Sequence, residues 1–232
     1  MKVDVCADAD AAARAAASLI AEEARAAVAA RGRFVLAVSG GHTPWQMLRC
    51  LADLSVPWAQ LHVVQVDERV APAGDPDRNL THLRESLLAR APLRPEQIHA
   101  MAVEAPDLDA ASRDYAAALA ALAGSPPVLD LTHLGLGPDG HTASLVPGDS
   151  VLGVTDRDVA PTGGLYQGHR RMTLTYPMLE RSRRILWLVT GSDKVPALGR
   201  LLAADPSIPA GTLPQDRAVL IADRAAAGSR PT

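Results

Sequence analysis

Three short polar segments carry the groups of this chain that could do chemistry. They are residues 39–43 (Ser-Gly-Gly-His-Thr), 67–69 (Asp-Glu-Arg) and 135–141 (Gly-Leu-Gly-Pro-Asp-Gly-His). Glycines let backbone N–H groups approach an anion, arginine holds phosphate oxygens through two N–H groups, and histidine exchanges protons near neutral pH. Such groups in one pocket would bind an anionic substrate and act on it by acid–base catalysis.

Each segment also has a purely structural interpretation. A glycine pair marks many tight turns between a strand and a helix, and residues 39–43 match neither a Walker loop nor a dinucleotide-binding fingerprint. The 67–69 tripeptide could be only a solvated charge cluster. In the functional interpretation, Asp67 would orient Arg69 or a substrate hydroxyl. Of the 7 histidines, only His42 and His141 lie in glycine-shaped loops after predicted strands.

Each polar segment follows a predicted strand. Apolar runs at 34–38, 61–66 and 128–134 have the length and continuous hydrophobicity of parallel strands that are covered on both faces. Ligands bind at the carboxyl ends of such strands, so we expect the three segments to line one pocket.

Predicted helices alternate with predicted strands along most of the chain. This alternation predicts an α/β fold: a single domain over residues 1–232, with a doubly wound, mostly parallel sheet and helices on both faces. Asp8 or Asp10 is the expected cap of the first helix, and Ser192 that of a later one. Residues 146–169 show no period and receive no assignment. We expect helices at 9–31, from about 43 or 44, at 80–90, 107–123 and 193–203, and further strands at 170–175, 183–189 and 218–221.

Two basic residues outside the three segments are further candidates. In the predicted strand 170–175, alternation places Arg171 on the face opposite Met172 and Leu174. That face could line the pocket, or it could simply face water. Lys194 lies in the first turn of the predicted helix 193–203, where its charge opposes the helix dipole. An anionic ligand would explain that position, and a solvated surface residue is the alternative.

The composition excludes several other kinds of protein. The 232 residues are 48% hydrophobic and 21% charged, as in a globular chain that needs neither disulfide nor metal to fold. A net charge of −3 provides no basic field for nucleic acid or membranes. Cys6 and Cys50 lack metal-ligand spacing and are expected to stay reduced. Without a signal-like or membrane-spanning apolar run, we expect a cytoplasmic protein.

Taken in order along the chain, the motifs resemble the 6-phosphogluconolactonase family. The most specific match is Gly-Leu-Gly-Pro-Asp-Gly-His-Thr-Ala-Ser at 135–144. His42 stands where a serine or another small polar residue is usual, Arg78 replaces a common serine and Val146 a common phenylalanine. The matching segments are 39–44, 66–70, Asn79, 134–148, 171–175, 191–194 and 223–226.

The resemblance implies one catalytic domain with a fold shared with glucosamine-6-phosphate deaminase and ribose-5-phosphate isomerase. It also implies hydrolysis of 6-phospho-D-glucono-1,5-lactone to 6-phospho-D-gluconate in the oxidative pentose phosphate pathway, with no cofactor and no metal. His141 would be the general base, and Asp139 would orient it or shape its loop. The residues expected to bind the substrate or its phosphate are Ser39, Gly40, Gly41, His42, Thr43, Asp67, Arg69, Asn79, Gly137, Arg171 and Lys194.

The expected partner is a small sugar-phosphate lactone, with no nucleic acid and no membrane, and the expected state is a monomer or weak homodimer. One alternative is a glucosamine-6-phosphate deaminase. That family continues its Gly-Asp-Gly-His loop with Ile-Ala-Phe-Asn-Glu, whereas residues 142–146 here are Thr-Ala-Ser-Leu-Val, and Arg69 stands where the deaminase has an aromatic residue. Another is a non-catalytic sugar-phosphate sensor, which would need a helix-turn-helix, but only one helix is predicted before Phe34.

Overall fold

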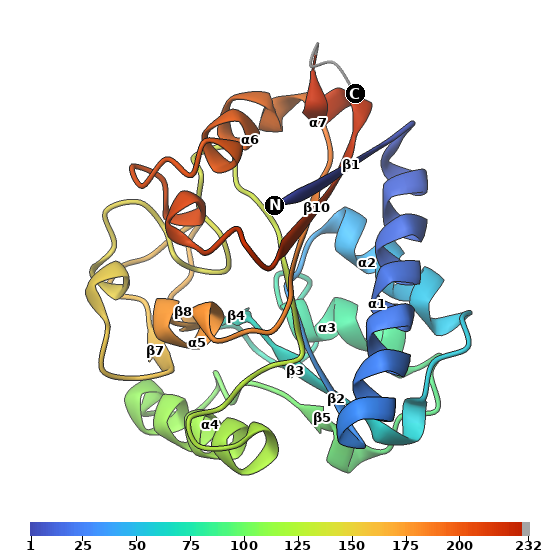
Figure 1. Ribbon diagram of the computed structural model, residues 1–232. Coiled ribbons are helices and arrows are strands. Elements are labelled where there is room, and N and C mark those ends of the chain that lie inside the picture. The colour runs from blue at the N-terminus through green and yellow to red at the C-terminus, as the bar shows by residue number, and fades with distance from the viewer. Residues whose placement is uncertain (229–232) are drawn as a thin grey trace.

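A computed structural model describes residues 1–228 and builds them around a seven-stranded sheet (Figure 1). The strand order is β1-β10-β9-β6-β2-β3-β5, and each neighbouring pair is parallel. The predicted fold class is confirmed, while residues 229–232 of the expected domain lie outside the described residues. The strands are β1 (Lys2–Cys6), β2 (Phe34–Val38), β3 (Leu61–Gln65), β5 (Ile98–His99), β6 (Leu131–Leu134), β9 (Ile185–Val189) and β10 (Ala218–Asp223).

Helices cover both faces of this sheet (Figure 1). Alternate residues of β2 show why its sequence is apolar throughout. Phe34 and Leu36 pack into the core beneath α1, α2 and α3, whereas Val35 and Ala37 pack into the core beneath α4, α5 and α6. The helices are α1 (Ala9–Arg31), α2 (His42–Ala52), α3 (Asn79–Leu83, continued by a π-helical turn at Arg84–Leu88), α4 (Leu108–Ala123), α5 (Tyr176–Glu180), α6 (Val195–Leu202) and α7 (Arg224–Ala227).

The first helix has the ends that its sequence predicts. The carboxylate of Asp8 accepts a hydrogen bond from the backbone N–H of Ala11 at 2.7 Å, and Gly32 ends the helix with φ 75°. The prediction for Ser192 is wrong. A 3₁₀ turn, Ser192–Lys194, precedes α6, which starts at Val195 with a proline in its first turn. Lys194 is therefore the residue before the helix.

A second sheet was not expected. It has three antiparallel strands in the order β4 (Asp67–Arg69), β8 (Arg171–Leu174) and β7 (Val159–Pro161). Residues 67–69 are thus a strand and not a loop, β8 lies outside the main sheet, and the unassigned segment 146–169 contains β7. Val66 joins the two sheets, because its N–H donates to Val38 O at 3.0 Å while its own carbonyl accepts from Leu174 N at 2.8 Å.

Candidate active site

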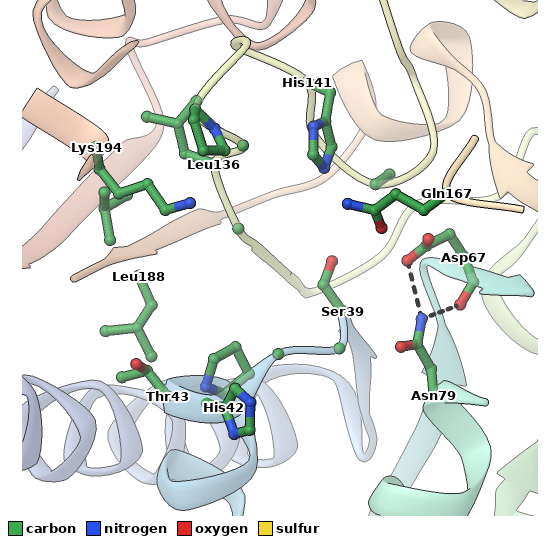
Figure 2. Close-up of a pocket in the computed structure, with 18 of the residues that line it drawn as sticks. Ser39, His42, Thr43, Asp67, Asn79, Leu136, His141, Gln167, Leu188 and Lys194 are labelled. Atoms are coloured by element: carbon green, nitrogen blue, oxygen red, sulfur yellow. Dashed lines mark hydrogen bonds between the residues drawn. The ribbon is translucent and has the colours of Figure 1, made fainter. Parts of the chain in front are cut away.

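The three polar segments meet around one cavity of about 580 Å³, a size typical of small-molecule sites (Figure 2). The loops that follow β2, β6 and β9 contribute to its wall, together with side chains of β4 and β8. The expected convergence is therefore confirmed. Asp139 contacts the lining residue His141 but does not itself line the cavity. The expected site residues that line it are Ser39, Gly40, Gly41, His42, Thr43, Asp67, Arg69, Asn79, Gly137, His141, Arg171 and Lys194.

His141 and Asp139 form a close pair. The imidazole Nδ1 lies 2.6 Å from Asp139 Oδ1, which also accepts the backbone N–H of His141 at 3.1 Å. Burial alone would raise the pKa of the Asp139 carboxyl, but these hydrogen bonds outweigh burial and the pKa is lowered. An ionised Asp139 places the imidazole proton on Nδ1 and leaves Nε2 as the basic nitrogen. The ring of His141 points into the cavity (Figure 2).

Two glycines in the 135–141 loop stand where a side chain would collide with a neighbour, Gly137 beside this pair and Gly140 beside Ile208. A Cβ on Gly137 would lie 2.0 Å from His141 Nδ1 and 2.6 Å from Asp139 Oδ1, so a side chain at this position would displace both groups. Gly140 has φ +86°, and a Cβ there would lie 2.5 Å from Ile208. The position of the imidazole therefore requires a glycine at 137, and the packing of the loop against Ile208 requires one at 140.

Hydrogen bonds from Ser39 to His133 of the neighbouring strand β6 fix the turn at 39–43. The N–H of Ser39 donates to Nδ1 of His133 at 3.3 Å, and Ser39 Oγ donates to the His133 carbonyl at 3.1 Å. Burial lowers the pKa of His133 to about 3, so its imidazole is neutral and accepts this bond. Gly40 leaves space for Asn79, because a Cβ there would lie 1.9 Å from Asn79 Oδ1. Gly41 is the N-cap of α2, so His42 and Thr43 of this segment are the first two residues of that helix.

Arg69 and Arg171 enter the cavity from the small sheet. They are register partners in the β4–β8 pair, and directly opposed residues project to the same side of a sheet. The Arg171 Nη2 donates to the carbonyl of Tyr166 at 3.3 Å and to Gln167 Oε1 at 3.2 Å. The strand-parity prediction for Arg171 is confirmed. All of β8 is buried, so the alternative with one face in water is wrong.

Asp67 supports Arg171 instead of Arg69. Its Oδ2 accepts a hydrogen bond from Ser144 Oγ at 2.6 Å and lies 4.0 Å from Arg171 Nη1. Burial lowers the pKa of the Arg171 guanidinium, and the charge of Asp67 opposes that effect. Arg69 instead donates to the carbonyl of Asp77 at 2.6 Å.

Arg78, one of the three departures from the family pattern, has a structural role. Its side chain is buried, with Nη1 2.9 Å from Glu104 Oε2 and Nε 3.6 Å from Glu68 Oε2. The Glu68 carboxylate accepts the backbone N–H groups of Asn79 and Leu80, each at 2.8 Å, and so holds the start of α3 at the cavity wall.

Several lining residues were missed by sequence reasoning. Tyr166 and Gln167 come from the unassigned segment 146–169, and Leu188 and Thr190 lie at and just after the end of β9. Gly168 is the one turn signal beside the first two, because glycine adopts positive φ readily, whereas Gln167 gives no such signal. In Figure 2, the amide of Gln167 and the amine of Lys194 both reach toward the centre of the cavity. Lys194 Nζ also lies 3.0 Å from Asp193 Oδ2.

Residues 1–228 contain no group of three or more His, Cys, Asp or Glu side chains placed to hold a metal ion. Within the same residues, no helix combines the length and apolar character required to cross a membrane.

Comparisons with known proteins agree with this arrangement. A family model described as glucosamine-6-phosphate isomerases/6-phosphogluconolactonase matches residues 7–221. A 6-phosphogluconolactonase of Synechocystis is 39% identical over 186 residues, covering 78% of this chain and 77% of the relative. One of Mycobacterium tuberculosis is 38% identical over 89% of each chain. The solved structure of 6-phosphogluconolactonase from Trypanosoma cruzi has the same fold, with a TM-score of 0.87 and 24% identity over 100% of this chain and 97% of that one. The chain therefore belongs to the glucosamine-6-phosphate isomerase/6-phosphogluconolactonase family.

Proposed function

We propose that this chain hydrolyses 6-phospho-D-glucono-1,5-lactone to 6-phospho-D-gluconate, a step of the oxidative pentose phosphate pathway. The observation that carries the proposal is that the His141–Asp139 pair shares one cavity with Arg69 and Arg171. The substrate is a cyclic ester with a phosphate of close to two negative charges, so it needs a base at one end and cations at the other. The curated relatives named above carry the same activity in their names.

His141 supplies the base. Its Nε2 takes a proton from a water molecule as that water attacks C1 of the lactone, and the resulting imidazolium then protonates the ring oxygen as the C1–O bond breaks. Asp139 stabilises the imidazolium through the bond to Nδ1. A lactone carbonyl is already more reactive than that of an open ester, so activated water is a sufficient nucleophile.

The phosphate binds at the cationic part of the cavity. Arg69, Arg171 and Lys194 supply positive charge, and the turn at 39–43 supplies backbone N–H groups at the start of α2. Phosphate lies several bonds from C1, so its binding fixes the position of the carbonyl relative to His141. Ser39, Asp67, Asn79 and the other polar lining groups surround the sugar hydroxyls between the two ends.

Residues 1–232 form one catalytic domain, which acts in the cytoplasm as a monomer or weak homodimer, without a cofactor. The rival deaminase activity is not favoured by the site. Arg69 lines the cavity, and residues 142–146 place no acidic side chain after His141.

The test is an assay on freshly prepared 6-phosphogluconolactone, in which acid release is followed above the spontaneous rate. We expect release that is proportional to protein concentration. Ammonia release from glucosamine 6-phosphate would instead support the deaminase. Binding of 6-phosphogluconate without turnover of the lactone would support a non-catalytic sensor.

A further inference from the structure

A tight hairpin at residues 166–169 closes one side of the cavity. The N–H of Tyr166 donates to His169 O at 3.0 Å, and the N–H of His169 donates back to Tyr166 O at 3.3 Å. The two residues between them, Gln167 and Gly168, have φ values of 52° and 84°. Positive φ at both central residues is typical of the two-residue turns that fit the twist of a hairpin.

The hairpin is fixed on both sides. Before it, the carboxylate of Asp149 accepts the N–H groups of Gly163 at 2.9 Å and Gly164 at 3.0 Å. After it, His169 reaches across to the segment behind β4, with Nδ1 3.2 Å from Val70 O and Nε2 3.0 Å from Asp77 Oδ2. These contacts set the position of the hairpin tip relative to the cavity.

Tyr166, the first residue of the hairpin, lies between His141 and the buried Arg171. Its hydroxyl donates to Asp139 Oδ2 at 3.3 Å and lies 3.3 Å from Nδ1 of His141. Its ring meets the His141 ring edge-on at 5.1 Å between centroids, and the guanidinium carbon of Arg171 lies 5.0 Å from the tyrosine centroid. Burial and the charge of Asp139 raise the pKa of Tyr166, so the phenol keeps its proton at neutral pH.

We infer that Tyr166 is a positioning residue for the His141–Asp139 pair. One oxygen of Asp139 accepts from the His141 side chain and backbone, and the other accepts from Tyr166. With a donor on each oxygen, the carboxylate has a single orientation, and the imidazole it holds keeps Nε2 directed at the substrate. The inference rests on the proposed function, because it assigns a role within the same site.

The hydroxyl and the ring of Tyr166 have separable effects. Among residues 1–228 the hydroxyl has hydrogen-bond partners only in Asp139 and His141, whereas the ring also packs against the guanidinium of Arg171. Tyr166→Phe should therefore lower kcat about 3- to 10-fold, the loss typical of one ordinary hydrogen bond, because the 3.3 Å contact with Asp139 is long, and leave KM unchanged. Tyr166→Ala should lower kcat by the same factor and raise KM as well.

Two further variants show whether Tyr166 acts through the base. In a His141→Ala background, Tyr166→Phe should cause no additional loss, because the group it positions is absent. Leu165→Ala, which changes an exposed neighbour in the same loop, should leave kcat and KM at wild-type values. Melting temperatures of all variants verify that each is folded.

Each outcome decides the matter. A normal kcat in Tyr166→Phe, a rise in KM with unchanged kcat, an equal loss in Leu165→Ala, or an additive loss in the His141→Ala background would overturn the inference. A wild-type protein without lactonase activity would contradict the proposed function itself, which is a separate result.

Discussion

Arg69 and Arg171 face each other directly across the antiparallel β4–β8 pair, so two guanidinium groups lie on one side of a three-stranded sheet. Like charges at opposed positions destabilise a sheet. The charge of Arg69 also adds to the effect of burial in lowering the pKa of Arg171. Both side chains line the cavity, where a phosphate with two negative charges would offset their repulsion. The pair is therefore best explained as part of an anion site.

The first prediction concerns the arginine that is less buried. Arg69→Ala should raise KM for 6-phosphogluconolactone about 10- to 100-fold, which corresponds to the loss of a charge-assisted hydrogen bond. Unphosphorylated gluconolactone should be turned over as in the wild type, so kcat/KM measured for both lactones gives the loss of selectivity. Arg170→Ala is the matched control, because this neighbour is exposed and does not line the cavity. Unchanged selectivity in Arg69→Ala would contradict the phosphate assignment.

The parts of the fold that the sequence predicted depend on local signals. A cap at Asp8 and a left-handed glycine at Gly32 fix the ends of α1, and both are readable from residue types alone. The meeting of the loops after β2 and β6 was predictable because parallel strands end at one edge of a sheet. That rule placed His42 and His141 at the same cavity without any knowledge of strand order.

The parts that were missed depend on partners far along the chain. Residues 67–69 are three polar residues without a strand period, and they are extended because β8 pairs with them. β7 is equally short and is held by the same strand. Tyr166 contacts the separate 135–141 loop and Arg171 of β8, and nothing in its sequence distance from His141 or Arg171 predicts these contacts.

The second prediction concerns Gly137, whose lack of a side chain leaves room for the His141 imidazole. Gly137→Ala should lower kcat about 100-fold, because the added methyl group would collide with both His141 and Asp139 and break the 2.6 Å contact between them. Gly135→Ala is the matched variant in the same loop, where a Cβ would meet nothing within 4 Å, and its effect should be far smaller. An equal loss of kcat in the two variants would show that any added side chain in this loop impairs catalysis, and that the position of the imidazole is not the cause.

The third prediction separates the base from its partner. His141→Ala should reduce kcat by about 10²- to 10⁴-fold, the usual contribution of a general base, with the fold intact by circular dichroism. Asp139→Asn keeps the shape but removes the charge that stabilises the imidazolium, so its rate should fall less than that of His141→Ala. Near-normal turnover in His141→Ala would rule out the proposed role.

The last prediction concerns His133, the buried histidine beneath the 39–43 turn. Burial lowers the pKa of His133 to about 3, whereas an unfolded histidine titrates near 6.5. As the pH falls from about 6.5 to about 3, the unfolded chain binds a proton at this position and the folded chain does not. Stability is therefore lost across this window as the pH decreases, by up to about 1.4 kcal/mol per pH unit from this residue.

A buried leucine does not titrate, so His133→Leu should remove this component of the pH dependence. Urea unfolding at several pH values between about 7 and 4 measures the difference, and the free energy of unfolding should fall less steeply with decreasing pH in the variant than in the wild type. The variant also loses the acceptor for the Ser39 N–H, so a lower stability at pH 7 is expected and does not affect the comparison of slopes. Parallel slopes would mean that His133 takes up its proton in the folded protein as readily as in the unfolded chain, which its complete burial in β6 argues against.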